Sequence, residues 1–163
     1  MQTIKGKRLE LLHNTHPENL TELLLSLRDV GRGFLVSEIL HDPLLLPDIQ
    51  KAIERIAQAR SLKERVMIFG DYDVDGISST ASLFLFLRDE LGMDVSYRLP
   101  HRVHDGYGIK SYHMDEIAKT GTKLVVTVDC GTKDAVPIEH ARALGMDVIV
   151  TDHQSCPEIL PQC

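Results

Sequence analysis

The sequence has few cysteines and no long apolar run, and each shortage excludes a class of protein. Its three cysteines, Cys130, Cys156 and Cys163, include no C-x-x-C pair. Neither a disulfide framework nor a structural zinc site is therefore expected. No apolar run is long enough to cross a bilayer, and no apolar signal core follows the charged N-terminus. We predict a cytoplasmic protein without a membrane partner.

Basic residues are also fewer than acidic ones. The 163 residues include 18 Lys and Arg against 24 Asp and Glu, which gives a formal net charge of -6. Nucleic-acid-binding proteins usually present a basic surface, so the charge argues against such a partner without excluding one. Metal bound at an aspartate cluster would offset part of this deficit, and a basic surface on another part of the protein would offset more.

The first sixty residues predict helices and carry no chemical motif. Leucines at helical spacing predict a helix over 17–30, and 34–40 could form a second, short helix. Asp48 is expected to cap a helix that runs through Ala59. We predict that residues 1–60 are a helical N-terminal extension that packs on the rest of the protein.

From Arg65 onward, short apolar segments alternate with helical patterns. This alternation predicts an α/β fold over residues 61–163, with a largely parallel sheet and helices on both faces. The predicted strands cover 66–69, 94–99, 124–128 and 148–151, and the predicted helices 77–91, 111–119 and 134–144. Asp134 is expected to cap the last helix. Because no helix follows the fourth strand, we expect the domain to be truncated at its C-terminus.

Three aspartates at alternate positions follow the first predicted strand. The apolar residues 66–69 are typical of a buried parallel strand, and they lead directly into Asp71, Asp73 and Asp75. Carboxylates this close repel one another. A positive group is therefore expected between them, and a divalent metal ion is the simplest candidate.

Two other predicted strands also end in groups that bind metals. Asp129 follows the third strand, and Asp152 and His153 follow the fourth. Ligands of open α/β sheets bind beyond the carboxyl ends of the strands, so these groups could share one crevice. Carboxylates with an imidazole suit Mn²⁺ or a similar divalent ion, with Mg²⁺ as an alternative. Taken alone, Asp129 fits a helix cap equally well, and a lone histidine is more often structural.

Two other motifs match parts of this pattern. Asp71, Asp73 and Asp75 have the spacing that opens an EF-hand loop, but the twelfth position is Ser82 instead of Glu. The segment from Asp73 also resembles the nucleophile loop of haloacid-dehalogenase-type enzymes, with Asp73 as nucleophile, Asp75 as acid/base and magnesium as cofactor. That alternative gives no role to Asp71 or to His153.

Four segments, in order, resemble the motifs of the DHH phosphoesterase superfamily. They are GDYDVDG at 70–76, PHRVHDGYG at 100–108, VDCG at 128–131 and TDH at 151–153. Within this superfamily the sequence is similar to the RecJ family of single-strand-specific DNA exonucleases. The resemblance implies a two-manganese site. Its catalytic metal ligands would be Asp73, Asp75, Asp129 and His153, with Asp71 and Asp152 orienting them.

The resemblance also implies a substrate-facing loop and a residue near the scissile phosphate. Arg102 would contact substrate phosphate, for which a guanidinium is well shaped. Tyr107 could stack on a base, although its glycine neighbours equally fit a plain turn. His101 and His104 are expected to belong to this loop and not to bind metal. Gln154 occupies the position that lies near the scissile phosphate in the superfamily.

The sequence departs from the superfamily pattern in three respects. Gln154 stands where the second histidine of the naming motif is expected, and glutamine cannot carry a positive charge. This change threatens catalysis more than metal binding. Asp105 stands where RecJ proteins usually have Glu. A further metal-binding aspartate and a second domain would lie beyond Cys163, so this segment alone is expected to be weakly active or inactive.

The sequence therefore predicts a metal-dependent hydrolase. The expected activity is that of an exonuclease that degrades single-stranded DNA in the 5′→3′ direction, in DNA repair and recombination, with other DNA-repair proteins as candidate partners. One alternative is a phosphodiesterase of short oligonucleotides or cyclic dinucleotides. Another is a catalytically degenerate scaffold or binding protein, because of Gln154.

Overall fold

The computed structural model describes residues 20–27, 41–158 and 160–163. Contacts between residues divide the chain into two units, Met1–Asp42 and Pro43–Cys163. The first contains helix α1 (Leu20–Leu27), which lies inside the range predicted from the leucine spacing. The second predicted helix, 34–40, lies outside the described residues. Every helix in the described part of the chain is too short or too polar to span a bilayer.

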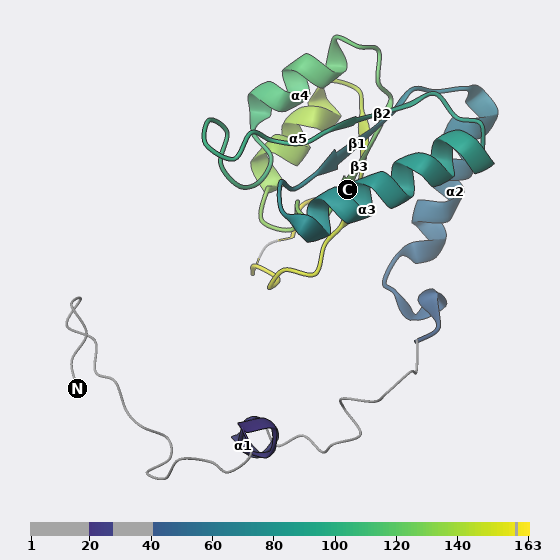
Figure 1. Ribbon diagram of the computed structural model, residues 1–163. Coiled ribbons are helices and arrows are strands. Elements are labelled where there is room, and N and C mark those ends of the chain that lie inside the picture. The colour runs from purple at the N-terminus through teal and green to yellow at the C-terminus, as the bar shows by residue number, and fades with distance from the viewer. Residues whose placement is uncertain (1–19, 28–40, 159) are drawn as a thin grey trace. The chain divides into compact units, whose positions relative to one another are not determined.

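The second unit is an α/β domain with a four-stranded parallel sheet. The strands lie in the order β2-β1-β3-β4, which confirms the predicted fold class (Figure 1). The elements are η2 (Pro43–Leu45), α2 (Ile49–Leu62), β1 (Val66–Gly70), α3 (Val74–Leu85), the π-helical turn η3 (Phe86–Glu90), β2 (Val95–Arg98), α4 (Ser111–Ala118), β3 (Leu124–Val128), α5 (Ala135–Ala143) and β4 (Asp147–Thr151).

The central strand β1 is buried on both faces. Val66 and Ile68 belong to a core that includes Ala59 of α2 and Leu87 of η3. The intervening residues of β1 belong to a second core, on the other face, with α4 and α5. Side chains alternate between faces along a strand, so one continuous apolar run supplies both cores. Figure 1 shows α4 and α5 together on one side of the sheet and α3 on the other.

Two glycines bring α3 close to the end of β1. A Cβ on Gly70 would lie 2.0 Å from Oγ1 of Thr80, and a Cβ on Gly76 would lie 2.5 Å from the backbone oxygen of Asp71. The backbone N–H of Gly76 donates to Oδ1 of Asp73 at 3.0 Å, so Asp73 caps the helix. Helix α3 therefore begins at Val74 and not at position 77, as the sequence predicted.

Two other helix starts differ from the predictions in their chemistry. Helix α2 follows Asp48, but this side chain makes no capping hydrogen bond and instead pairs with Lys51 at 2.6 Å. Asp134 precedes α5 but likewise does not cap it. Its Oδ2 accepts a hydrogen bond from the N–H of Ile109 at 3.0 Å. Helix α2, which the sequence analysis assigned to the N-terminal extension, lies in the second unit.

Candidate metal centre

The parallel register brings the residues that follow β1, β3 and β4 to one edge of the sheet. Gly70, the last residue of β1, aligns with Val128 of β3. Val128 in turn aligns with Thr151, the last residue of β4. The aspartates that follow these three strand ends therefore lie at the same edge, where open α/β sheets bind their ligands.

Three carboxylates meet at this edge. One oxygen each of Asp71, Asp73 and Asp129 lies within 4.8 Å of the other two. Asp71 is buried, with 3% of its surface exposed, whereas Asp73 is exposed. Asp71, which the sequence analysis placed behind the ligands, thus supplies one of the three convergent oxygens. We call this group the aspartate cluster.

The aspartate cluster fits a divalent cation. Within the described residues, the buried Oδ1 of Asp71 has no hydrogen-bond partner. Burial, followed by the neighbouring Asp73, raises the pKa of Asp71 even though the backbone of Tyr72 and the charge of Arg102 oppose the increase. Burial and Asp73 also raise the pKa of Asp129. These shifts reflect mainly the cost of burying a charged carboxylate, and secondly repulsion from Asp73. A bound cation would offset both.

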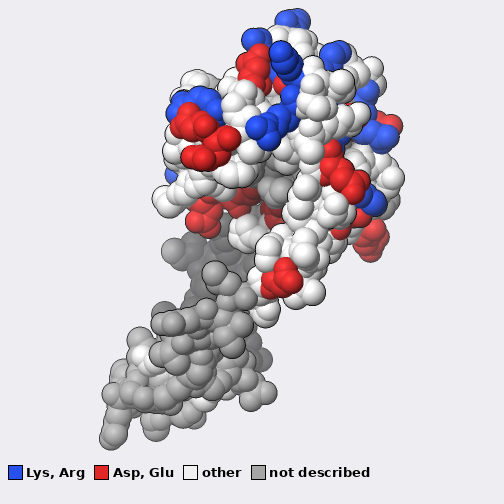
Figure 2. Space-filling model, turned by 90° about the vertical axis from the view of Figure 1, so that its right-hand side faces the viewer, with Lys and Arg blue, Asp and Glu red and all other residues white. Residues whose placement is uncertain are grey.

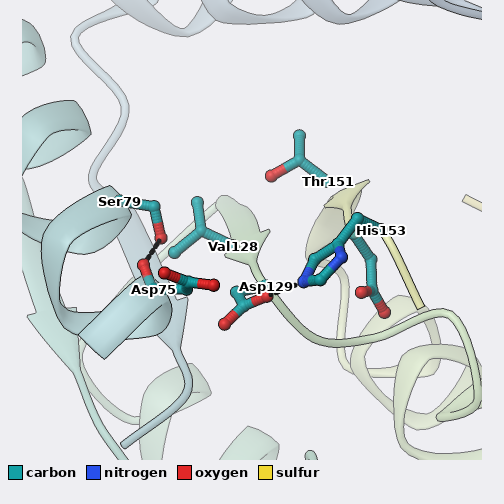
Figure 3. Close-up of a pocket in the computed structure, with 7 residues that line it drawn as sticks. Asp75, Ser79, Val128, Asp129, Thr151 and His153 are labelled. Carbon is teal, nitrogen blue, oxygen red and sulfur yellow. Dashed lines mark hydrogen bonds and ion pairs between the residues drawn. The ribbon is translucent and has the colours of Figure 1, made fainter. Parts of the chain in front are cut away.

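The other predicted ligands border an adjoining pocket of about 390 Å³, lined by Asp75, Ser79, Val128, Asp129, Thr151, Asp152 and His153. Figure 3 shows Asp75 on the first turn of α3, with its carboxylate pointing across this pocket toward Asp129. Nε2 of His153 lies 2.8 Å from Oδ1 of Asp129. Three of the four predicted ligands therefore border this pocket, and the fourth, Asp73, is joined to it through Asp129, which is common to the aspartate cluster and the pocket.

The backbone of Asp129 has an unusual conformation that ends β3. Its φ is +62°, in the left-handed region that non-glycine residues rarely occupy. Its N–H still pairs with the carbonyl of Thr151 at 2.9 Å. Gly131 follows with φ +113°, and a Cβ there would lie 2.8 Å from Oγ1 of Thr127. This strained turn directs the Asp129 side chain toward Asp71 and Asp73.

Asp152 holds the loops after β3 and β4 together. Its Oδ2 accepts from the N–H of Thr132 at 3.0 Å, and its Oδ1 accepts from the N–H of Gln154 at 2.9 Å. Burial alone would raise the pKa of Asp152, but these hydrogen bonds outweigh it and lower the pKa. Since both oxygens are already engaged, Asp152 is suited to fixing the backbone on either side of His153.

The loop 100–108 lies against the same edge of the sheet. The guanidinium of Arg102 lies 5.3 Å from the ring centroid of Tyr72, a residue that stands between Asp71 and Asp73 in the sequence. The hydroxyl of Tyr107 donates to the carbonyl of Asp129 at 3.4 Å. Burial and nearby acidic groups raise the pKa of Tyr107. Nδ1 of His101 accepts from the N–H groups of Val103 and His104, so it serves the loop itself.

Sequence reasoning missed two residues near the site. The ring of Tyr72 lies under the guanidinium of Arg102. The position of Tyr72 between two motif aspartates could have indicated that it lies near the site. Ser79 borders the pocket one helical turn after Asp75, and its hydroxyl donates to the Asp75 carbonyl at 2.7 Å. The i, i+4 spacing of these two residues was the signal for Ser79.

Comparison with known proteins gives the same relatives by sequence and by structure. Residues 65–163 match the model described as DHH family, N-terminal domain. The chain is 37% identical over 158 residues to the single-stranded-DNA-specific exonuclease RecJ of Bacillus subtilis, an alignment covering 90% of this chain and 20% of the relative. It is 39% identical over 116 residues to the Escherichia coli exonuclease of the same name, covering 71% of this chain and 20% of the relative.

Two solved structures resemble the α/β domain. A crystal structure of exonuclease RecJ bound to manganese superposes with a TM-score of 0.68 at 33% identity, covering 72% of this chain and 30% of that one. A structure of RecJ in complex with Mn²⁺ from Thermus thermophilus superposes with a TM-score of 0.61 at 30% identity, covering 72% of this chain and 16% of that one. The chain spans about a fifth of the length of the curated relatives.

Proposed function

This chain belongs to the DHH family, and on that premise we propose that the protein is a metal-dependent phosphodiesterase that removes nucleotides from single-stranded DNA. The observation that carries the proposal is the aspartate cluster, in which oxygens of Asp71, Asp73 and Asp129 converge. The names of the relatives, which are single-stranded-DNA-specific exonucleases, support the choice of substrate.

We propose that the aspartate cluster and the adjoining pocket hold divalent cations. Asp73, Asp75, Asp129 and His153 are the proposed ligands, and the position of Asp71 supports adding it to them. Two such ions would activate a water molecule and stabilise the charge that develops on the phosphate. The titles of the similar structures favour Mn²⁺, and Mg²⁺ is the alternative. Asp152 is proposed to keep His153 oriented through the backbone.

The proposed substrate contacts come from the loop 100–108. Arg102 is exposed, and its guanidinium lies over the ring of Tyr72, so it is accessible to an anionic ligand such as a phosphate. Tyr107 could stack on a base beside it. On the face in Figure 2, Lys and Arg side chains are intermixed with Asp and Glu side chains. Among the described residues, this face therefore presents no broad basic surface.

The finer parts of the proposal rest on the resemblance to RecJ. They are 5′→3′ polarity, a role in DNA repair and recombination alongside other repair proteins, and a cytoplasmic location. Single strands labelled at either end test the polarity, because the label that is released first marks the end attacked.

The experiment that tests the proposed activity uses the full-length protein and labelled single-stranded DNA with Mn²⁺. We expect cleavage that a chelator abolishes and that Asp73→Ala combined with Asp75→Ala reduces by at least about 10³-fold, since metal ligands and their charge supply most of the stabilisation. Asp115→Asn is the matched control, because Asp115 pairs with His140 on the α4–α5 side. An unchanged rate in the double variant would contradict the mechanism.

Gln154 favours a second candidate, a binding or scaffold protein without turnover. Its backbone N–H supports Asp152, which any residue except proline could do. Its side chain cannot relay a proton in the way that histidine can. A substrate panel that compares long single strands, dinucleotides and cyclic dinucleotides distinguishes the exonuclease from enzymes of small substrates, and DNA binding without cleavage would support the scaffold.

A further inference from the structure

We infer that Asp105 is a positioning residue that fixes the loop carrying Arg102, so that Arg102 meets the substrate phosphate beside the aspartate cluster. This inference rests on the proposed function. Asp105 lies three residues after Arg102 in the sequence, and its side chain makes its contacts with the start of its own loop and with α4.

The first observation is a closed turn around Arg102. The N–H of Asp105 donates to the carbonyl of His101 at 2.9 Å. In the reverse direction, the N–H of His101 donates to Oδ2 of Asp105 at 2.6 Å. Arg102 lies between the two ends of this reciprocal pair. Its backbone direction is therefore set by the hydrogen bonds of Asp105.

The second observation is the attachment of this turn to α4. The hydroxyl of Tyr112 donates to Oδ1 of Asp105 at 2.6 Å. Nε2 of His113, which is fully buried, faces Oδ2 of Asp105 at 3.8 Å and has no hydrogen-bond partner within the described residues. The hydrogen bonds from Tyr112 and His101 lower the pKa of Asp105, so the carboxylate is ionised and accepts hydrogen bonds strongly.

Helix α4, which supplies the Tyr112 hydrogen bond to Asp105, is packed against the sheet. His113 contacts the ring of Phe69 on β1, with centroids 5.1 Å apart. Its neighbour Met114 has 1% of its surface exposed, within the core of that face of the sheet. Asp105 thus connects an exposed loop to a rigid element, as precise binding sites require.

The third observation is the position of the Arg102 side chain. Its guanidinium lies over the ring of Tyr72, 5.3 Å from the centroid, and Tyr72 stands between Asp71 and Asp73 in the sequence. A cation over an aromatic face is attracted to it without losing its capacity to donate hydrogen bonds. Arg102 is therefore near the aspartate cluster yet available to an anionic ligand.

A double-mutant cycle in the full-length protein tests this inference, with kcat and KM measured separately on single-stranded DNA. We expect Asp105→Asn to raise KM by about tenfold and Arg102→Ala to raise it at least as much, by loss of a charged contact. If Asp105 acts through Arg102, adding Asp105→Asn to Arg102→Ala raises KM by less than about twofold further. A multiplicative effect, or no effect of Asp105→Asn alone, would overturn the inference.

Two further variants separate positioning from folding. Tyr112→Phe removes one hydroxyl donor to Asp105 and keeps the ring, so we expect a smaller rise in KM that also disappears in the Arg102→Ala background. Mn²⁺ uptake measured by calorimetry should be unchanged in Asp105→Asn, and reduced uptake would contradict a role confined to the loop. Absence of nuclease activity in the wild-type protein would instead contradict the proposed function, so the two failures are distinguishable.

Discussion

His153 and Asp129 meet across the ends of two neighbouring strands, with Nε2 of the imidazole 2.8 Å from Oδ1 of the carboxylate. The Asp129 side chain is nearly buried, with 7% exposed, whereas that of His153 is 72% exposed. Asp129 is also part of the aspartate cluster. The imidazole is therefore placed to complete a metal site whose most buried parts are carboxylates.

We predict that His153→Ala lowers the affinity for Mn²⁺ by about 10- to 100-fold, as when groups that orient or complete a metal site are removed. Calorimetric titration of the wild-type and variant proteins with Mn²⁺ measures the difference. Equal affinity in the two proteins would exclude His153 as a ligand.

Replacing Gln154 with histidine, a residue that can relay a proton, should raise turnover. Because general acid–base catalysis contributes roughly 10²- to 10⁴-fold when well placed, we expect Gln154→His to raise kcat by about 10- to 100-fold with unchanged Mn²⁺ affinity. Single-turnover cleavage measures the change. Activity in the variant alone would favour the scaffold alternative for the natural protein, and an unchanged kcat would mean that this side chain does not approach the reacting phosphate.

The close approach of β1 and α3 should make Gly70 intolerant of a side chain. A Cβ there would lie 2.0 Å from Oγ1 of Thr80 and 2.9 Å from Leu99, so Gly70→Ala should lower the free energy of unfolding by about 1–3 kcal/mol. Urea unfolding measures the loss. In a Thr80→Ala background the loss should be smaller, because the nearest obstructing atom is gone. The same loss in both backgrounds would mean that this contact is not the cause.

Asp134→Asn should stabilise the protein near neutral pH. Burial raises the pKa of Asp134, against the opposing hydrogen bond from the Ile109 N–H and the charge of Lys110. A carboxyl whose pKa is raised by folding adds stability below its unfolded pKa of about 3.9, and this contribution is lost as the pH rises through the folded pKa. Asparagine keeps an acceptor for Ile109 and carries no charge.

The stability difference between Asp134→Asn and wild type should therefore grow as the pH increases from about 4 to 7. Denaturant unfolding at matched pH values measures it. Asp115→Asn is a suitable control, since Asp115 is half exposed and pairs with His140. A difference that shrinks with increasing pH would contradict the assigned direction of the pKa shift.

Much of the fold follows from local patterns in the sequence. The apolar run at 66–69 and the range 124–128 predicted β1 and β3 almost to the residue, because strands buried on both faces are continuous in hydrophobicity. The start of α3 was placed three residues late, since Asp73 was considered as a metal ligand and not also as a helix cap. The strand order depends on pairing between distant segments, which no local pattern contains.

The candidate site was predictable in its composition and less so in its geometry. Strand-end aspartates on a parallel sheet were expected to converge, and the oxygens of Asp71, Asp73 and Asp129 do. The hydrogen bonds from the Ile109 N–H to Asp134 and from the Tyr112 hydroxyl to Asp105 could not be predicted from the sequence. Both depend on how a loop folds back onto a helix. The ligand assignments themselves stay predictions.

The most direct test of the metal site is a crystal structure of the full-length protein grown with Mn²⁺, with anomalous scattering recorded to locate the ions. We predict an anomalous peak within coordination distance of carboxylate oxygens of Asp73 and Asp129, and a second ion a few ångströms away, roughly 3.5–4 Å in two-metal sites. A crystal grown with saturating Mn²⁺ that shows no anomalous peak among Asp71, Asp73, Asp129 and His153 would contradict the account.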